Sequence, residues 1–219
     1  MDEHIVISIA RQYGSGGKTI GEMYAKEMGI PCYGRNLLQM AADESGISEQ
    51  LFMQLDEKLR NSPLLRMTTD VYDGKVSSPG HKDFVAAKNL FNYQAEIIKR
   101  VAKTENCVIV GRAADFVLKD YPNVVSVFVH ASPEFNLARA MERNSMTTPE
   151  MEKFIASTDK FRAEYYKQYT GREWSDARNY DRCLNSGKLG FEKSVEEIKA
   201  YNKVRIHEGC TFRTEKLIK

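Results

Sequence analysis

The chain has 219 residues, with 32 Lys and Arg against 30 Asp and Glu, which gives a net charge of +2 at pH 7. This length suits one substantial domain with a well-buried core. The balanced charge argues against a protein that lives on nucleic acid or on an anionic membrane, so a cationic binding site is expected to be local.

The cysteine pattern and the start of the chain both point to a reducing compartment. The four cysteines are widely spaced and form no Cys-x-x-Cys pair, which disfavours a zinc site and a disulfide framework. Asp2 and Glu3 precede the first apolar run, whereas a secretory signal begins with basic residues. No apolar run approaches the roughly 20 residues that span a bilayer. We therefore expect a cytoplasmic protein.

The first thirty residues predict a strand, a glycine loop and a helix. Residues 5–10 form an apolar run, and residues 20–28 have helical periodicity. Glycines let backbone N–H groups curl around a phosphate, and the positive end of the helix dipole faces the same anion. The loop between strand and helix consists of Gly14, Ser15, Gly16, Gly17, Lys18 and Thr19.

This loop is interpreted as a binding site for the phosphate tail of a nucleotide. Lys18 adds a positive charge, and the Thr19 hydroxyl stands where a ligand of a phosphate-bridging Mg²⁺ is expected. The spacing departs from the usual phosphate-binding pattern, because Gln12 occupies the position of the first glycine. A flexible glycine turn before a helix is the alternative.

The remaining elements alternate between helices and strands. Helices are predicted over 36–44, 84–103, 133–143, 149–169 and 191–203. A further helix is predicted from the cap Ser48 onward, because leucines follow it every four residues. Strands are predicted at 32–33, 107–110, 124–129 and 180–185, and residues 61–82 form a long loop that we expect to be mobile. This order predicts an α/β protein whose parallel sheet is covered on both faces.

Further cations are predicted at the carboxyl edge of this sheet. Arg112 follows the strand at 107–110, so it is expected beside the glycine loop, where it can hold a phosphate with two hydrogen bonds. Arg139 and Arg143 share one helix face, and Asp159 and Arg162 share a face of the next helix. These charges are either a solvated surface or part of a hinged cover that closes over a polyphosphate and excludes water.

Taken in order, the motifs resemble those of the cytidylate kinase-like family. The resemblance covers about residues 4–204 and rests on the glycine loop, Gly111 to Asp115, Ser132 to Glu134 with Arg139 and Arg143, Asp159 to Tyr166, and Tyr180 to Asn185. It implies a P-loop kinase of three α/β/α layers, with a five-stranded parallel sheet and a helical lid at 139–172. The domain would then span 1–204, with an acceptor-binding region at 48–82 and a tail at 205–219.

The resemblance also implies roles for individual residues. The loop and Arg139 would hold the ATP phosphates, Asn185 would lie near the adenine ring, and Arg35 and Arg112 would grip the phosphate of the acceptor. Lys18, Arg112, Arg143 and Arg162 would act in catalysis, with Asp159 orienting an arginine at the substrate. The implied reaction is ATP- and Mg²⁺-dependent phosphorylation of CMP or dCMP, with small nucleotides rather than nucleic acid or membrane as partners.

Two other functions remain open from the sequence. One is phosphorylation of a different small metabolite. The other is nucleotide binding without turnover in a regulatory protein, which Gly34 favours because related chains usually have Asp there. The tail at 205–219 has no clear periodicity, and it is either disordered or in contact with another subunit of a homo-oligomer.

Overall fold

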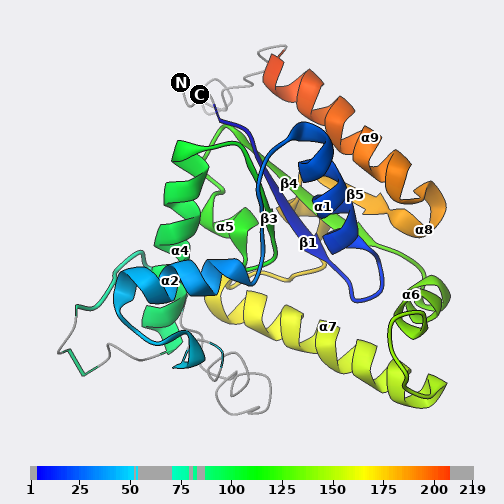
Figure 1. The fold of residues 1–219 in the computed structure, drawn as a ribbon, viewed down its shortest axis with the longest axis horizontal. Helices are drawn as coiled ribbons and strands as arrows, with labels where there is room; N and C mark the ends of the chain where they lie inside the picture. The colour runs from blue at the N-terminus through cyan, green and yellow to red at the C-terminus, as the bar shows by residue number, and fades with distance from the viewer. Residues whose placement is uncertain (1–3, 52, 54–70, 79–80, 83–86, 208–219) are drawn as a thin grey trace, which may run out of the picture.

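A five-stranded parallel sheet lies between two layers of helices (Figure 1). The computed structural model describes residues 4–51, 53, 71–78, 81–82 and 87–207. The three-layer α/β/α architecture with a five-stranded parallel sheet, predicted from the sequence and the resemblance, is therefore confirmed.

The central strand of the sheet is the one that leads into the glycine loop. The strand order is β2-β3-β1-β4-β5, so β1 pairs with β3 on one side and with β4 on the other. The crossovers on the two sides of β1 leave in opposite directions, which opens a crevice at its carboxyl end, where ligands bind in such sheets. The strands are β1 (Val6–Arg11), β2 (Cys32–Tyr33), β3 (Cys107–Val110), β4 (Val124–His130) and β5 (Arg182–Asn185).

Alternating residues of β1 enter two separate cores. Ile7 and Ile9 pack with side chains of α1 (Gly17–Met28) and α9 (Phe191–Asn202), whereas Val6 and Ala10 pack on the opposite face. That second face is covered by α2 (Asn36–Ser45), α4 (Ala87–Thr104), α5 (Ala114–Val117) and the second half of α7 (Thr148–Thr170). Burial of both faces explains why the central strands β1, β3 and β4 read as largely apolar runs.

Helix ends follow local capping more closely than apolar periodicity. The helix α1 begins at Gly17, three residues before the periodic segment at 20–28. Gly16, in a left-handed conformation, is the residue that precedes its first turn. The helix α6 (Pro133–Met141) is capped as predicted by Ser132, whose Oγ accepts the N–H of Phe135 at 3.3 Å. The cap of α7 at Thr147 is a reciprocal one with Glu150, which accepts the Thr147 N–H at 2.8 Å.

Short elements near the C-terminal part of the chain were not predicted. The helix α8 (Ser186–Leu189) follows β5 directly, and a 3₁₀ turn at Ala177–Asn179 precedes β5. After α9, Lys203–His207 forms a π-helical turn in which Arg205 donates to Asp181 Oδ2 at 2.7 Å. The first residues of the expected tail are thus bound to the domain, and 208–219 lie outside the described residues.

Much of the expected acceptor-binding region at 48–82 falls outside the described residues. Ser48 does cap a helical turn, since its Oγ accepts the N–H of Leu51 at 3.3 Å. Residues 71–78 lie against the start of α4, where Asn89 Oδ1 accepts the N–H of Ser77 at 2.6 Å. The expected mobility of this region therefore stays a prediction. In the part of the chain that the structure describes, no helix is long and apolar enough to cross a membrane.

Candidate active site

The glycine loop joins β1 to α1 in a tightly constrained turn. Gly14 and Gly16 have φ angles of 82° and 77°, in the left-handed region that favours glycine. A Cβ on Gly14 would lie 2.3 Å from the backbone oxygen of Asn136, and one on Gly16 would lie 2.3 Å from the ring of Phe191. The glycines are therefore required by both conformation and close packing, and the loop is held in one shape.

The side chains of Gln12 and Ser15 anchor this loop. Gln12 Oε1 accepts the N–H of Ala131 at 3.3 Å, so the residue in the place of the usual first glycine ties the loop to the end of β4. The buried Ser15 hydroxyl lies 2.9 Å from the Gln12 carbonyl and 3.1 Å from that of Val129. Ser15 can therefore offer a ligand only its backbone N–H.

Replacing Gly14 by alanine is expected to destabilise the protein more than the same change at Gly46. Gly46 also has a positive φ, of 69°, but a Cβ there would meet nothing within 4 Å. The control therefore loses only about 1 kcal/mol, from the left-handed backbone. The clash at Gly14 should add roughly 1–3 kcal/mol. Urea unfolding of both variants measures the difference, and equal losses would show that the loop has room to move.

The first of two adjoining cavities, here called the loop cavity, opens between the glycine loop and the end of α6. It has a volume of about 180 Å³ and is lined by the loop glycines together with Lys18, Thr19, Arg139 and Arg143. Arg143 Nη2 donates to Thr19 Oγ1 at 3.4 Å, which connects the turn after α6 to the start of α1. Lys18 is 73% exposed and 3.4 Å from Glu22.

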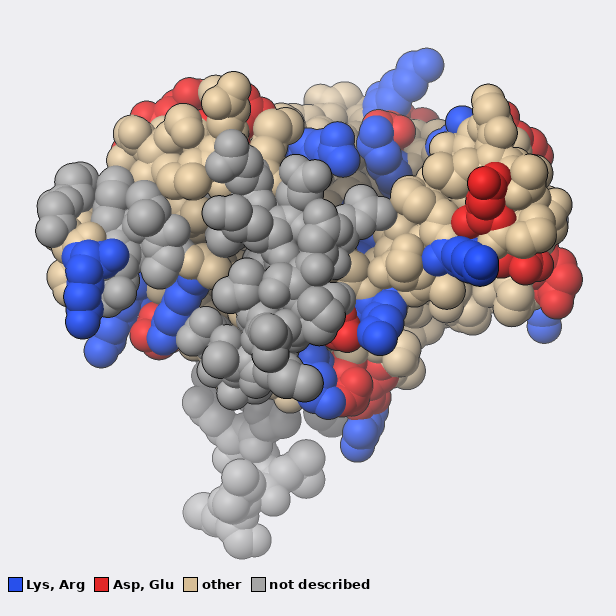
Figure 2. Space-filling view, turned by 90° about the horizontal axis from the view of Figure 1, so that it is seen from below, with Lys and Arg blue, Asp and Glu red and all other residues tan. Residues whose placement is uncertain are grey.

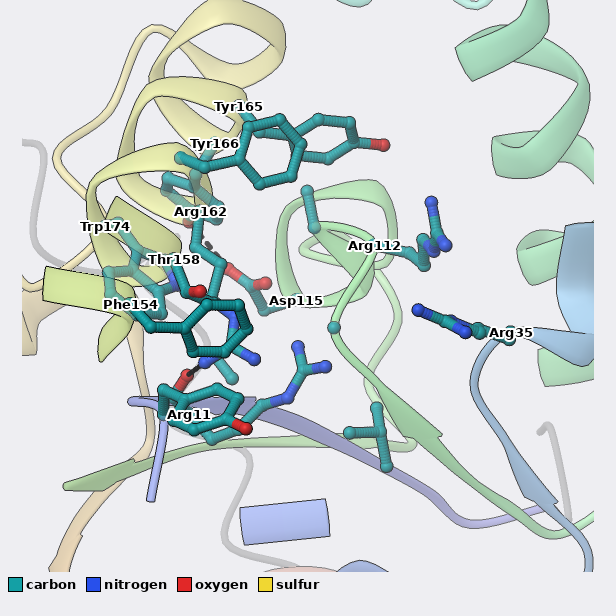
Figure 3. Close-up of a pocket in the computed structure, with 16 residues that line it drawn as sticks. Arg11, Arg35, Arg112, Asp115, Phe154, Thr158, Arg162, Tyr165, Tyr166 and Trp174 are labelled. Carbon is teal, nitrogen blue, oxygen red and sulfur yellow. Dashed lines mark hydrogen bonds between the residues drawn. The ribbon is translucent and has the colours of Figure 1, made fainter. Parts of the chain in front are cut away.

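The second cavity, here called the arginine cavity, has a volume of about 390 Å³. Figure 3 shows Arg11 and Arg35 extending toward each other, with Arg112 above Arg35 on a third segment and the side chains of α7 on the opposite wall. Arg162 is the fourth arginine in the lining, and Asp115 is its one acidic residue among those that the structure describes. The aromatic part of the wall consists of Tyr13, Phe154, Phe161, Tyr165, Tyr166 and Trp174.

Arg11, Tyr13 and Arg162 line both cavities and form the junction between them. Asp159 Oδ1 accepts the Tyr13 N–H at 2.8 Å and Arg162 Nη1 at 3.0 Å, and Arg162 Nη1 also donates to the Arg11 carbonyl at 3.1 Å. Tyr13 packs edge-on against Phe154, with ring centroids 5.2 Å apart. These contacts fix α7 to the loop, so ligands in the two cavities would meet at this junction.

The junction lies at the edge of the sheet that Figure 2 views from below. In that view basic side chains flank a hollow near the upper centre of the face, beside the grey residues. The arginines that line the two cavities come from this edge of the sheet.

The model of the cytidylate kinase-like family matches residues 6–188. The chain belongs to the cytidylate kinase-like family. The matched span includes every residue that lines the two cavities. The family and the glycine loop together support a P-loop kinase that transfers a phosphoryl group.

Solved structures of three other proteins resemble this cytidylate kinase-like chain. An uncharacterised protein from Eubacterium ventriosum is 26% identical, with a TM-score of 0.69 over 92% of this chain and 100% of its own. Shikimate kinase from Bacteroides thetaiotaomicron is 15% identical, with a TM-score of 0.49 over 90% and 97% of the two chains. Shikimate kinase from Acinetobacter baumannii, in complex with shikimate, is 10% identical, with a TM-score of 0.49 over 95% and 97%. No curated protein matches the chain.

The electrostatics of the arginine cavity favour an anionic ligand of this kinase-like protein. Burial, together with the charges of Arg162 and Arg112, lowers the pKa of Arg11 to about 9. The side chain therefore stays protonated at pH 7, where these two arginines repel it. Burial raises the pKa of Asp115 to about 6 although its Oδ2 accepts the Tyr166 hydroxyl at 2.6 Å. The described lining thus carries four arginines and Asp115, with Asp159 paired to Arg162 outside it, and an anion would relieve the repulsion that acts on Arg11.

The backbone of the turn after β3 aims Arg112 into the cavity. Gly111, Arg112 and Ala113 have φ angles of 82°, 61° and 51°, so two residues with side chains adopt the left-handed conformation. Such a conformation costs about 1–2 kcal/mol for each residue with a Cβ. Strain of this kind is found where the position of a side chain matters for function.

The structure brings most of the sequence-predicted site residues together. Lys18, Thr19, Arg139 and Arg143 line the loop cavity, Arg35 and Arg112 line the arginine cavity, and Arg162 lines both. Asp159 lines neither, but it holds Arg162 as predicted. Asn185 is also absent from both linings, and its Oδ1 accepts the N–H of Lys188 at 3.2 Å as the cap of α8. Its expected place beside the adenine ring stays a prediction.

Proposed function

We propose that the protein transfers the γ-phosphoryl group of ATP to a nucleoside monophosphate, with CMP or dCMP as the acceptor. The observation that supports this reaction is the pair of adjoining cavities that share Arg11, Tyr13 and Arg162. One cavity has the glycine loop of a phosphate donor site. The other has the arginines and aromatic rings that suit a phosphorylated planar acceptor.

The donor phosphates would lie in the loop cavity. Backbone N–H groups of the loop and the N-terminal end of α1 offer them positive charge, and Lys18 reaches them once it leaves Glu22. Among the described residues, Thr19 supplies the one hydroxyl at the helix start and no carboxylate lines this cavity. This donor set fits Mg²⁺, which takes most of its ligands from phosphate and water and would neutralise charge on the donor phosphates.

Transfer would take place at the junction of the cavities. An oxygen of the acceptor phosphate, held by Arg112 and Arg35, attacks the γ-phosphorus while the bond to the bridging oxygen of ADP breaks. Arg143 lies on the donor side and Arg162 at the junction, where they can balance the charge of the group in flight. The segment 139–172 carries these arginines, and we assign it the role of a lid that excludes water.

The acceptor base would occupy the aromatic end of the arginine cavity. Ring faces such as those of Phe154 and Tyr165 stack on any nucleobase, so they favour a planar acceptor without selecting cytosine. Thr158 and Asp115 are polar groups of this lining that can read the edge of a base. A different phosphorylated metabolite with an apolar part is therefore the second candidate acceptor.

An assay of ADP release tests the proposed reaction. ATP with Mg²⁺ is offered together with CMP, dCMP, UMP, AMP or GMP, and the product is identified by chromatography. We expect release to depend on the acceptor and to be fastest with CMP or dCMP. The Lys18→Ala variant, assayed with the same acceptors, gives the background of ADP release that does not depend on the glycine loop.

Two results of this assay contradict the proposed reaction. When phosphorylated metabolites are added to the acceptor panel, stimulation by one of them and not by these nucleotides would replace the acceptor and retain phosphoryl transfer. Tight ATP binding without acceptor-dependent release would assign the protein to nucleotide binding without turnover.

A further inference from the structure

The side chain of Arg11 runs from the end of β1 through a slot between two glycines. A Cβ on Gly17 would lie 2.5 Å from the Cβ of Arg11, and a Cβ on Gly111 would lie 2.3 Å from its Nη1. Gly111 also has a φ of 82°, a left-handed conformation that favours glycine. A Cβ at this position would point at the arginine. Both glycines, one before α1 and one after β3, therefore leave room for this single side chain.

The guanidinium end of Arg11 faces other arginines rather than a carboxylate partner. Within the described part of the chain it makes no hydrogen bond and no ion pair, and its strongest charged neighbours are Arg162 and Arg112. Asp159 attracts it more weakly, and the Oδ1 of that carboxylate already accepts two hydrogen bonds. Figure 3 shows the guanidinium extending into the cavity toward Arg35.

A guanidinium that faces other arginines and has no carboxylate partner is unusual where its role is only to stabilise the fold. Buried or partly buried arginines in protein interiors are normally paired, because an unpaired charge loses hydration without compensation. The five N–H donors of a guanidinium match the oxygens of a phosphate in two-point contacts. The position at the junction, where both cavities share Arg11, places such an anion next to the donor phosphates.

We propose that Arg11 is a substrate-binding residue that grips the phosphate of the acceptor and makes the site select phosphate dianions over monoanions of the same shape. The proposal rests on the proposed function in taking the arginine cavity as the acceptor site. It goes beyond that function by assigning the role to the last residue of β1. Neither the glycine loop motif nor the arginines predicted from the sequence include this residue.

The single tryptophan of the chain provides a direct readout of this cavity. Trp174 lines the arginine cavity and is 8% exposed, so its fluorescence should respond to a ligand there. The probes are phenyl phosphate, largely a dianion at pH 8, and phenyl sulfate, a monoanion of similar shape. ADP at saturating concentration occupies the loop cavity in both titrations, so that the probes cannot bind to the glycine loop.

The variants are chosen to separate binding from folding. Arg11→Met keeps an unbranched stem between the glycines and removes the charge, and Arg11→Lys keeps a charge without the two-point contact. Arg178→Met is the matched control, since its side chain is 89% exposed and pairs with Asp176 outside both cavities. Thermal unfolding without ligand shows whether each variant is folded.

We expect Arg11→Met to bind phenyl phosphate roughly ten- to a hundredfold more weakly than the wild type, because a charge-assisted contact is lost. Phenyl sulfate binding should change less, so the preference for the dianion falls. The unfolding temperature should stay the same or rise, since a repelled charge is removed. Arg11→Lys should fall between the two, and Arg178→Met should match the wild type.

Wild-type affinity for phenyl phosphate in a folded Arg11→Met variant overturns the proposal. If Arg11→Met does not fold, Arg11→Lys decides in the same way. A preference for the dianion that depends on Arg11, in a protein that phosphorylates no acceptor, would support the role of Arg11 and contradict the proposed transfer reaction. The two proposals can therefore fail separately.

Discussion

Replacing Lys18 by alanine is expected to lower the rate of phosphoryl transfer on the order of 100- to 1000-fold, the usual loss when one preorganised donor to a transition state is removed. The lysine stands at the start of α1, where the loop N–H groups and the helix dipole converge. Its loss should appear in kcat, because the charge on the transferring group is greatest in the transition state.

The same substitution should leave the fold almost unchanged. Lys18 is 73% exposed, and its partner Glu22, 3.4 Å away, is one turn along the helix and 52% exposed. Such a pair contributes about 0.2–0.5 kcal/mol. Lys26→Ala, an exposed lysine in the last turn of the same helix, is the matched control. Near-normal kcat for Lys18→Ala, with the control equal to the wild type, would remove this residue from the mechanism.

The parts of the fold that follow from periodicity were predicted well. The central strands β1, β3 and β4 and the long helices show their type because buried strands are largely apolar and surface helices repeat every three to four residues. Both Gly111-Arg112 and the glycine loop could be placed at one edge of the sheet, because every parallel strand ends there. Local signals sufficed for these features.

The complete lining of the site could not be predicted from the sequence. Arg11 reads as the last residue of a strand, and only the parallel pairing of β1 with β3 brings it to Gly111. Phe154, Tyr165 and Tyr166 read as an apolar stripe on a helix, and α7 turns them toward the cavity because Asp159 holds the helix against Tyr13. Contacts over such sequence separations leave no local pattern.

The structure gives a role to Gln12, which stands where the phosphate-binding motif usually has its first glycine. Its amide oxygen accepts the N–H of Ala131, a contact across 119 residues that anchors the loop to the turn before α6. The residue is thus part of the support of the glycine loop, and its presence does not require that phosphate binding be lost. Gly34 has open space around the position of a Cβ, so the structure gives no steric reason for a glycine there.

Replacing Arg112 by alanine is expected to raise the KM for the acceptor about ten- to a hundredfold, with a much smaller effect on the KM for ATP, because one charge-assisted contact to the acceptor phosphate is lost. Arg112 lines the arginine cavity and is absent from the lining of the loop cavity. Initial rates measured against each substrate in turn give the two constants.

Arg139→Ala provides the opposite comparison. Arg139 lines the loop cavity, where its guanidinium lies 5.0 Å from the centre of the Phe191 ring, and it is absent from the lining of the arginine cavity. We therefore expect this variant to raise the KM for ATP more than that for the acceptor. The pair of variants tests the division of labour between the cavities, because a general loosening of the site would raise both constants in both variants. Equal rises would mean that donor and acceptor are not bound separately on the two sides of Arg11, Tyr13 and Arg162.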